Sequence, residues 1–363
     1  MSTRRVTILG GGAGARTAAV EFALSGHHVT LCEAPAFSET LVGIGSAGSI
    51  EATGVISGEA AVHVGQDIGA SIAEAEVILV VVPTMHQMTF VDLVAPHLRD
   101  GMNLVFMPGS LGSLEAAHRL RTAGITADIT ISEIAALPYA TRIVGPNTVR
   151  VFGRRRYVSI GTFPSQATNR VLPVMRDLYP GIEQMPNVLE AGLNNPNPTL
   201  HCLGVLLSAS RIEYSHGEFY YYEEGMTPHV CQAIEAIDAE RQTIGAALGV
   251  DVLSLLDTYA KMGYGPSGVS FWSVIRGVAA LNGIKGPTEI DSRYLTEDVP
   301  IGLTIYSQLG RQLGVDVPLM ESVIHLSGAL LGRDFVAGGR TVDRCGIAGM
   351  TRDRLVDYVT SGS

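Results

Sequence analysis

Two short stretches of the sequence combine residue types that can move protons and bind an anion. NNPNPTLHCLG places His201 at the start of an apolar run, and DSRYLTEDVPIGL supplies Arg293 and Asp298 just before another. Histidine exchanges protons near neutral pH, a carboxylate can fix its tautomer, and arginine binds carboxylates through a planar fork. The residue types alone leave a structural role open for each: a packed histidine, a helix-terminus acid, and a surface arginine paired with Asp291 or Glu297.

The helix that should carry His201 has a recognisable beginning. Asn197 is a good N-cap residue and Pro198 suits the first helical position, which places His201 in the first turn. Gly204 lies on the same helix face and should leave space beside the imidazole. Because a helix N-terminus disfavours a protonated imidazole, a catalytic histidine here would need a carboxylate partner.

A glycine-rich turn near the N-terminus predicts a nucleotide site. In RRVTILGGGAGARTAAVEFALSGHHVTLCEA we expect a strand at Val6–Leu9, a helix at Thr17–Ser25 and a second strand at His28–Cys32. The turn between the first strand and the helix is Gly10 to Ala15, a G-x-G-x-x-A pattern. Such a turn in a βαβ unit holds a dinucleotide pyrophosphate against the helix N-terminus.

Each residue of that turn has an expected task. Gly10 allows the sharp turn, Gly12 lets the backbone approach the pyrophosphate, and Ala15 permits close packing of the helix. Ala13 and Gly14 complete the predicted cofactor-binding loop.

Glu33 indicates which dinucleotide binds. It ends the second predicted strand, near the roughly 20-residue distance from the turn at which an acid contacts the adenosine ribose. A carboxylate there accepts hydrogen bonds from ribose hydroxyls and repels a 2′-phosphate, so the sequence favours NAD over NADP. A solvent-exposed acid at a strand end is the structural alternative.

The apolar run Val77–Val82 predicts a central parallel strand that is buried on both faces. Ligands of such sheets lie beyond the carboxyl ends of the strands, so Val82 and Pro83 join the predicted cofactor-binding residues.

Composition excludes several classes of protein. The chain has 363 residues, is 46% hydrophobic and carries a formal charge of −10, which gives no reason to expect nucleic acid or an anionic membrane as partner. We expect a cytoplasmic protein, since no signal peptide or membrane span is visible. Its four scattered cysteines, which lack metal-ligand spacing, should be reduced and mostly buried, and no metal site is predicted. The run Arg154, Arg155 and Arg156 is interpreted as a solvated turn.

The pattern as a whole predicts an α/β protein with two domains: a Rossmann-type dinucleotide-binding domain at residues 1–186 and an all-helical domain at 187–363. The first domain should continue with a strand and helix within Asn103–Arg121, a strand in ITADITISEIAAL, and a last strand and helix, followed by a linker near 180–187. In the second domain helices are expected at Pro198–Ile212, Val230–Leu248, Val252–Lys261, Ile301–Leu313 and Leu319–Leu331.

Several ordered motifs together resemble one family. They are GGGAGA with Glu33, VVVPTMH, PYATR, NPNPTLH, YYYEEGMTP, SRYLTEDVPIGL and the C-terminal GRTVDRCGIAGMT. The chain resembles the octopine/opine dehydrogenases, particularly the bacterial enzymes that make N-(1-carboxyethyl) amino acids, over nearly its whole length. Its glycine turn departs slightly from the family pattern in having Ala15 where many members have glycine.

The resemblance implies a reaction and roles. A 2-keto acid such as pyruvate condenses with the amine of an amino acid, and the imine is reduced by NADH. By matching motif, His201 is the general acid/base, Asp298 orients and charges it, and Arg293 binds the keto-acid carboxylate. The tyrosine-rich segment and Arg142 are candidate surroundings of the substrate, with packing or ion pairing as alternatives. A homodimer is also expected.

Two other functions remain open at this stage. One is a keto-acid reductase of the ketopantoate reductase type, many of which use a lysine as acid/base, but Lys261 and Lys285 are the only lysines and neither begins the first helix after the linker. The other is an inactive dinucleotide sensor, which would have no use for His201, Arg293 and Asp298 together.

Overall fold

The computed structural model describes residues 2–263 and 270–363. It forms two compact units: unit 1 comprises Met1–Gly192 with Tyr358–Ser363, and unit 2 comprises Leu193–Asp357. The chain divides at Gly192, a few residues beyond the expected boundary at 186. The reason is local: the segment expected to be a linker contains β12 (Glu183–Gln184), which pairs with β11, and is followed by α7 (Val188–Leu193).

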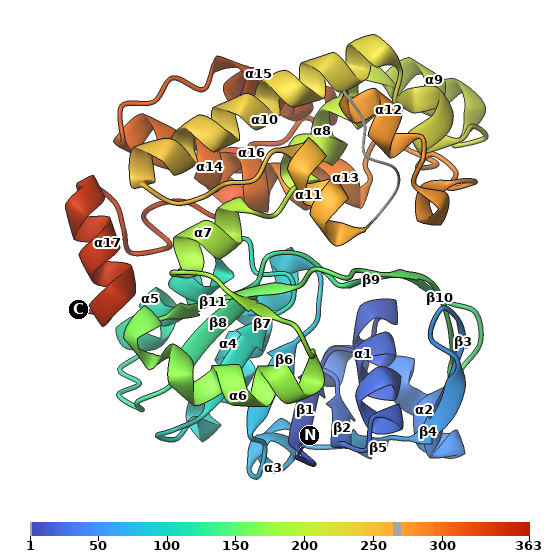
Figure 1. Cartoon of the computed structure of the whole chain (residues 1–363), viewed down its shortest axis with the longest axis vertical. Coiled ribbons are helices and arrows are strands. Elements are labelled where there is room, and N and C mark those ends of the chain that lie inside the picture. Colours follow the sequence, from blue (N-terminus) through green and yellow to red (C-terminus); the bar gives the residue numbers. More distant parts are fainter. Residues whose placement is uncertain (1, 264–269) are drawn as a thin grey trace. The chain divides into compact units, whose positions relative to one another are not determined.

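Unit 1 is built on an eight-stranded sheet with the order β12-β11-β8-β7-β6-β1-β2-β5 (Figure 1). From β5 to β8 the strands are parallel and follow the Rossmann order, whereas β11 is antiparallel to β8. The strands are β1 (Arg5–Leu9), β2 (His28–Cys32), β5 (His63–Gly65), β6 (Val77–Val80), β7 (Asn103–Phe106), β8 (Thr130–Ile134) and β11 (Ser159–Phe163). The strands predicted in this region are present in the expected order, whereas the edge strands β5 and β12 were not predicted.

Helices connect these strands. They are α1 (Ala13–Leu24), α2 (Val42–Ala47), α3 (Ile68–Ile72), α4 (Gln87–Val94), α5 (Gly112–Thr122) and α6 (Thr168–Leu178). Every residue of β6 is buried, as expected for a central parallel strand, although the strand ends at Val80 rather than Val82.

A second, four-stranded sheet was not predicted. Its order is β4-β3-β10-β9, and all four strands contact α1. The strands are β3 (Ser49–Gly54), β4 (Gly58–Ala61), β9 (Tyr139–Ile143) and β10 (Thr148–Arg154). Arg154 ends β10 and forms an ion pair with Glu21, so the interpretation of Arg154 as part of a solvated turn was wrong.

Unit 2 is helical within its described residues, apart from one isolated bridge between Tyr220 and Lys285. Its helices are α8 (Asn197–Leu207), α9 (Ala209–Ser215), α10 (Pro228–Leu248), α11 (Leu255–Met262), α12 (Phe271–Ile275), α13 (Arg293–Thr296), α14 (Thr304–Gln312), α15 (Pro318–Leu331) and α16 (Phe335–Gly338), and α17 (Arg352–Ser361) begins there. The long α10 packs against α8, α12, α14 and α15. The fold class expected from the sequence is confirmed, but the helix expected at Pro198–Ile212 is two helices that meet at Ser208.

Among the described residues, no helix combines the length and hydropathy needed to cross a bilayer. All four cysteines are buried.

Candidate functional site

The glycine turn lies where the strand order of the sheet reverses, between β1 and β6. Gly10 has φ of 121°, which favours glycine, and its amide donates to the Cys32 carbonyl. A Cβ atom on Gly10 would lie 2.5 Å from the Val81 oxygen and 2.8 Å from Cγ1 of Val82. Val82 therefore lies beside the turn, at the switch point where such sheets bind ligands, and Pro83 follows it in the chain.

The rest of the turn fits a pyrophosphate. Gly12 is exposed and serves as the N-cap of α1, and a Cβ built on it would meet no atom within 4 Å. Ala13 and Gly14 form the partly exposed first turn of α1, while Ala15 is fully buried in the core. An open backbone at a helix N-terminus is the arrangement that holds phosphates.

Glu33 follows β2 at the same edge of the sheet. One carboxylate oxygen accepts a hydrogen bond from the amide of Ala34 at 2.8 Å. Partial burial raises the pKa of Glu33, and bonds from the amides of Ala34 and Gly11 oppose that rise. Glu33 thus lies against the glycine turn.

Sequence reasoning missed a buried cation beneath this turn. Arg16 is 4% exposed and donates three hydrogen bonds to main-chain carbonyls, those of Gly11, Thr40 and Pro146. It joins the glycine turn to the 3₁₀-helical segment Pro35–Leu41, which contains Thr40, and to the loop of Pro146 between β9 and β10. The sequence carries no signal for this role beyond the position of an arginine directly after GGGAGA.

In unit 2, His201 and Asp298 form a hydrogen-bonded pair although they are 97 residues apart. Nδ1 of His201 lies 2.8 Å from a carboxylate oxygen of Asp298, and the two side chains are 13% and 14% exposed. Burial raises the pKa of Asp298, and the bond from His201 opposes that rise. Because an ionised carboxylate only accepts hydrogen bonds, the pair fixes the proton on Nδ1 and leaves Nε2 as the basic nitrogen.

Tyrosines surround the His201 ring. The Tyr294 ring lies 4.4 Å from the imidazole, the Tyr222 hydroxyl is 3.3 Å from Nε2, and the Tyr221 hydroxyl donates to the main-chain oxygen of His201 at 3.1 Å. Tyr221 also stacks on Tyr294. Two π-helical segments, Tyr221–Gly225 and Val299–Leu303, lie at this cluster, the second directly after Asp298.

Arg293 begins α13 and forms an ion pair with Glu297. Its Nε and Nη2 atoms donate to one oxygen of Glu297 at 2.7 and 2.5 Å, and the arginine side chain remains 70% exposed. Asp291, the other partner considered from the sequence, pairs with Arg333 instead. Glu297 engages one edge of the guanidinium, which has further N–H donors for an anion.

Two local expectations about α8 were wrong. The helix begins at Asn197 after Pro196, and the side chain of Asn195 accepts the Asn197 amide, so Asn197 is not the N-cap. His201 consequently lies in the second turn. A Cβ on Gly204 would overlap the hydroxyl oxygen of Tyr221, so Gly204 makes room for this tyrosine rather than for the imidazole.

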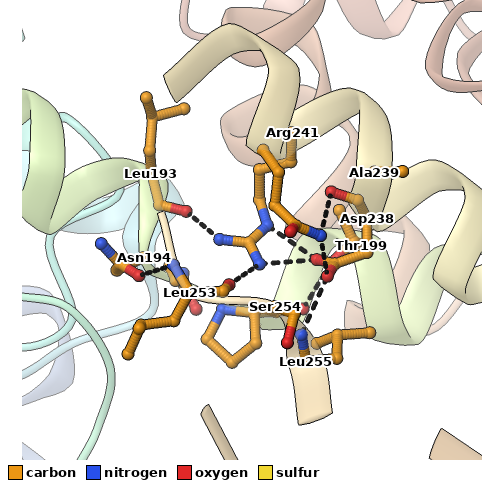
Figure 2. A network of polar contacts seen from close by, with 12 residues as sticks. Leu193, Asn194, Thr199, Asp238, Ala239, Arg241, Leu253, Ser254 and Leu255 are labelled. Carbon is orange, nitrogen blue, oxygen red and sulfur yellow. Dashed lines mark hydrogen bonds and ion pairs between the residues drawn. The ribbon is translucent and has the colours of Figure 1, made fainter. Parts of the chain in front are cut away.

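A buried ion pair fixes the base of α8 (Figure 2). Arg241 and Asp238 on α10 are 0% and 2% exposed and are joined at 2.6 Å. Arg241 also donates to the carbonyls of Leu193 and Leu253, and Asp238 accepts from the amide of Leu255. Since Leu193 leads into α8, this network holds the segment that carries His201, and nothing in the sequence pattern pointed to it.

Among the described residues, no group of three or more histidines, cysteines or acidic residues is arranged to hold a metal ion. Lys285 lies in an exposed ion pair with Glu218, not beside His201.

Comparison with known proteins agrees with these features. Residues 184–331, which include His201, Arg293 and Asp298, match a family described as NAD/NADP octopine/nopaline dehydrogenase, alpha-helical domain. An opine dehydrogenase of Arthrobacter sp. (strain 1C) is 34% identical over 286 residues, 78% of this chain and 79% of the relative. Protein ocs of Agrobacterium tumefaciens (strain Ach5) is 28% identical over 359 residues, 97% of this chain and 98% of that protein.

A solved octopine dehydrogenase with NADH and L-arginine has the same fold, with a TM-score of 0.78 at 19% identity over 99% of this chain and 98% of that one. The resemblance found in the motifs is thus confirmed, and the chain belongs to the octopine/opine dehydrogenase family.

Proposed function

We propose that the protein is an NAD(H)-dependent opine dehydrogenase that condenses a 2-keto acid such as pyruvate with the amine of an amino acid, and catalyses the reverse oxidation. As a member of its family it is an oxidoreductase that acts on CH–NH bonds. The observation that carries the proposal is the buried His201–Asp298 pair, with Arg293 five residues before Asp298 in the chain. The same protein also has a Rossmann glycine turn. Residues 1–186 would bind the dinucleotide and residues 187–363 would carry the proton-transfer groups.

The cofactor site is proposed to consist of the glycine turn, Glu33, Val82 and Pro83. NADH, when bound, supplies the hydride that reduces the imine. The open backbone of Gly12 and the N-terminus of α1 would hold the pyrophosphate. The carboxylate of Glu33 would accept from the adenosine ribose, which favours NAD over NADP.

His201 is proposed to move the protons of the condensation. Joining an amine to a carbonyl gives a carbinolamine, whose hydroxyl must be protonated before it leaves as water. With the Nδ1 proton directed at Asp298, Nε2 is the atom that exchanges protons with the substrate. Asp298 stabilises the imidazolium that forms, because the opposite charge is already in place at 2.8 Å.

Arg293 is proposed to bind the carboxylate of the keto acid. Its planar fork suits a carboxylate, and its high exposure leaves it accessible despite the bond to Glu297. A cytoplasmic location and a homodimer are also proposed. The exposed apolar side chains Leu319, Leu326 and Leu330 of α15 support the homodimer.

The test is NADH oxidation with pyruvate, 2-oxobutyrate or 2-oxoglutarate, each with and without a panel of L-amino acids and amines. We expect oxidation that requires both substrates. Oxidation with a keto acid alone would contradict the proposal and indicate a hydroxy-acid dehydrogenase.

Two variants test the assigned roles. His201→Ala should abolish turnover and still bind NADH, measured by nicotinamide fluorescence, whereas Arg293→Ala should mainly raise KM for the keto acid. Unchanged turnover in His201→Ala would refute the assignment of the acid/base.

A further inference from the structure

Both ring nitrogens of His201 have partners in this structure. Asp298 engages Nδ1, and the hydroxyl of Tyr222 lies 3.3 Å from Nε2. The proposed reaction needs Nε2 to exchange a proton with the substrate. The Tyr222 hydroxyl lies next to Nε2, so it is placed to take part in that proton transfer.

The position of the Tyr222 hydroxyl is well defined. Tyr222 lies in the π-helical segment Tyr221–Gly225, a type of distortion that is frequent at functional sites. Its side chain is 5% exposed, and its ring meets the Tyr221 ring edge to face at 5.0 Å. The π-helix and the packing of the tyrosines therefore direct this hydroxyl to the imidazole.

The state of the hydroxyl suits a donor. Burial, together with the neighbouring tyrosines, raises the pKa of Tyr222 well above its usual value, so the phenol stays protonated. The 3.3 Å separation is longer than the usual O–H···N contact. Catalytic hydrogen bonds are often long before substrate binds and shorten in the complex. The Tyr222 hydroxyl also has a hydrogen bond with the side chain of Tyr294, so it has a second partner for its proton beside the imidazole.

We propose that Tyr222 is a further catalytic residue, which passes the proton between Nε2 of His201 and the departing hydroxyl of the carbinolamine. This inference rests on the function proposed above. The Tyr222 hydroxyl proton moves to the carbinolamine oxygen while the Nε2 proton of the imidazolium moves to the Tyr222 oxygen. The C–O bond breaks and its electrons leave with water, and the nitrogen lone pair forms the C=N bond. Tyr222 ends unchanged, and His201 ends neutral.

The test compares Tyr222→Phe with wild type in steady-state assays with saturating NADH. Loss of one proton-transfer group should lower kcat about 10- to 100-fold, which is at or below the lower limit of the roughly 10²- to 10⁴-fold that acid/base groups contribute, because water can replace the hydroxyl in part. KM for the keto acid should change by no more than about threefold, since the carboxylate contact is unaltered. Tyr214→Phe, at an 89% exposed tyrosine of α9, is the matched control and should behave as wild type.

Two further readouts separate catalysis from structure. The proton on Nδ1 in the pair with Asp298 should give a downfield NMR resonance that persists in Tyr222→Phe, which would show that the pair is intact. If Tyr222 acts through His201, the double variant Asp298→Asn, Tyr222→Phe should lose less kcat than the product of the two single losses.

The outcomes are distinct. If wild type and Tyr214→Phe do not oxidise NADH with any pair of substrates, the proposed function fails. If wild type is active and Tyr222→Phe keeps kcat within about threefold, the inference about Tyr222 is wrong and the proposed function stands. If the downfield resonance is lost with kcat, the tyrosine positions the imidazole and does not relay the proton.

Discussion

Replacing Gly204 by alanine tests how tightly the tyrosines hold the helix of His201. Gly204 is buried on α8, and a Cβ there would overlap the hydroxyl oxygen of Tyr221 and lie 2.8 Å from Cε of Met226. The methionine end can move, but the hydroxyl is held by its bond to the main-chain oxygen of His201 at 3.1 Å. The substitution should therefore displace Tyr221 and break that bond.

The magnitude follows from three opposing effects. Inserting a methyl group into a packed region destabilises by about 1–3 kcal/mol. The lost hydrogen bond removes about 1 kcal/mol, and the better helix propensity of alanine restores about 1 kcal/mol. Gly204→Ala should thus lower the free energy of unfolding by about 1–3 kcal/mol, and kcat should fall because the support of His201 moves.

The assay exploits the single tryptophan of the chain. Trp272 lies in α12, so its fluorescence during urea denaturation reports on unit 2 rather than on the whole protein. The matched comparison is Gly204→Ala combined with Tyr221→Phe, which removes the overlapping oxygen. The double variant should be about as stable as Tyr221→Phe alone. Equal urea midpoints for Gly204→Ala and wild type, or no recovery in the double variant, would refute the reasoning.

Two other substitutions have effects on stability and function of opposite sign. The pKa of Glu33 is raised in the folded protein, so at a pH above that value its ionised form destabilises the folded state. Glu33→Gln should therefore raise the urea midpoint at pH 8, and this gain should vanish as the pH falls below about 4.5. The preference for NADH over NADPH should decrease in the same variant. A wild-type protein that already prefers NADPH would contradict this role. The pKa of Asp298 is raised by burial, so by the same linkage the Asp298→Asn variant should be at least as stable as wild type at pH 8. Its kcat should nevertheless fall about 10²- to 10⁴-fold, because His201 loses the negative charge that stabilises the imidazolium. A kcat within tenfold of wild type would show that the charge is not needed.

The dinucleotide-binding part of unit 1 could be predicted because its signals are local. Strand β1, the glycine turn, α1 and β2 follow one another without interruption, and each has its own hydrophobic pattern. The second sheet could not be predicted in this way. Its central pairing joins Glu51 to Thr148, and nothing near either residue indicates the other.

The candidate site of unit 2 shows the same division. The residue types made His201, Arg293 and Asp298 candidates for catalysis, but their spacing in the sequence did not predict that they lie near one another. Only the family resemblance assigned a role to each. His201 and Asp298 are 97 residues apart in the chain, and tertiary packing brings their side chains to within 2.8 Å. The contact of Tyr222 with Nε2 depends on a π-helical turn, which has no sequence pattern comparable to that of an α-helix.

The return of the chain to unit 1 has a consequence for biosynthesis. Tyr358 belongs to unit 1, where its ring lies 5.1 Å from that of Phe163 and beneath the guanidinium of Arg121. On the ribosome, the first 192 residues emerge long before this tyrosine does, and all of unit 2 is made in between. The nascent Rossmann unit is therefore made without the aromatic partner of Phe163, and premature termination just before Tyr358 would leave this phenylalanine and Arg121 without that contact.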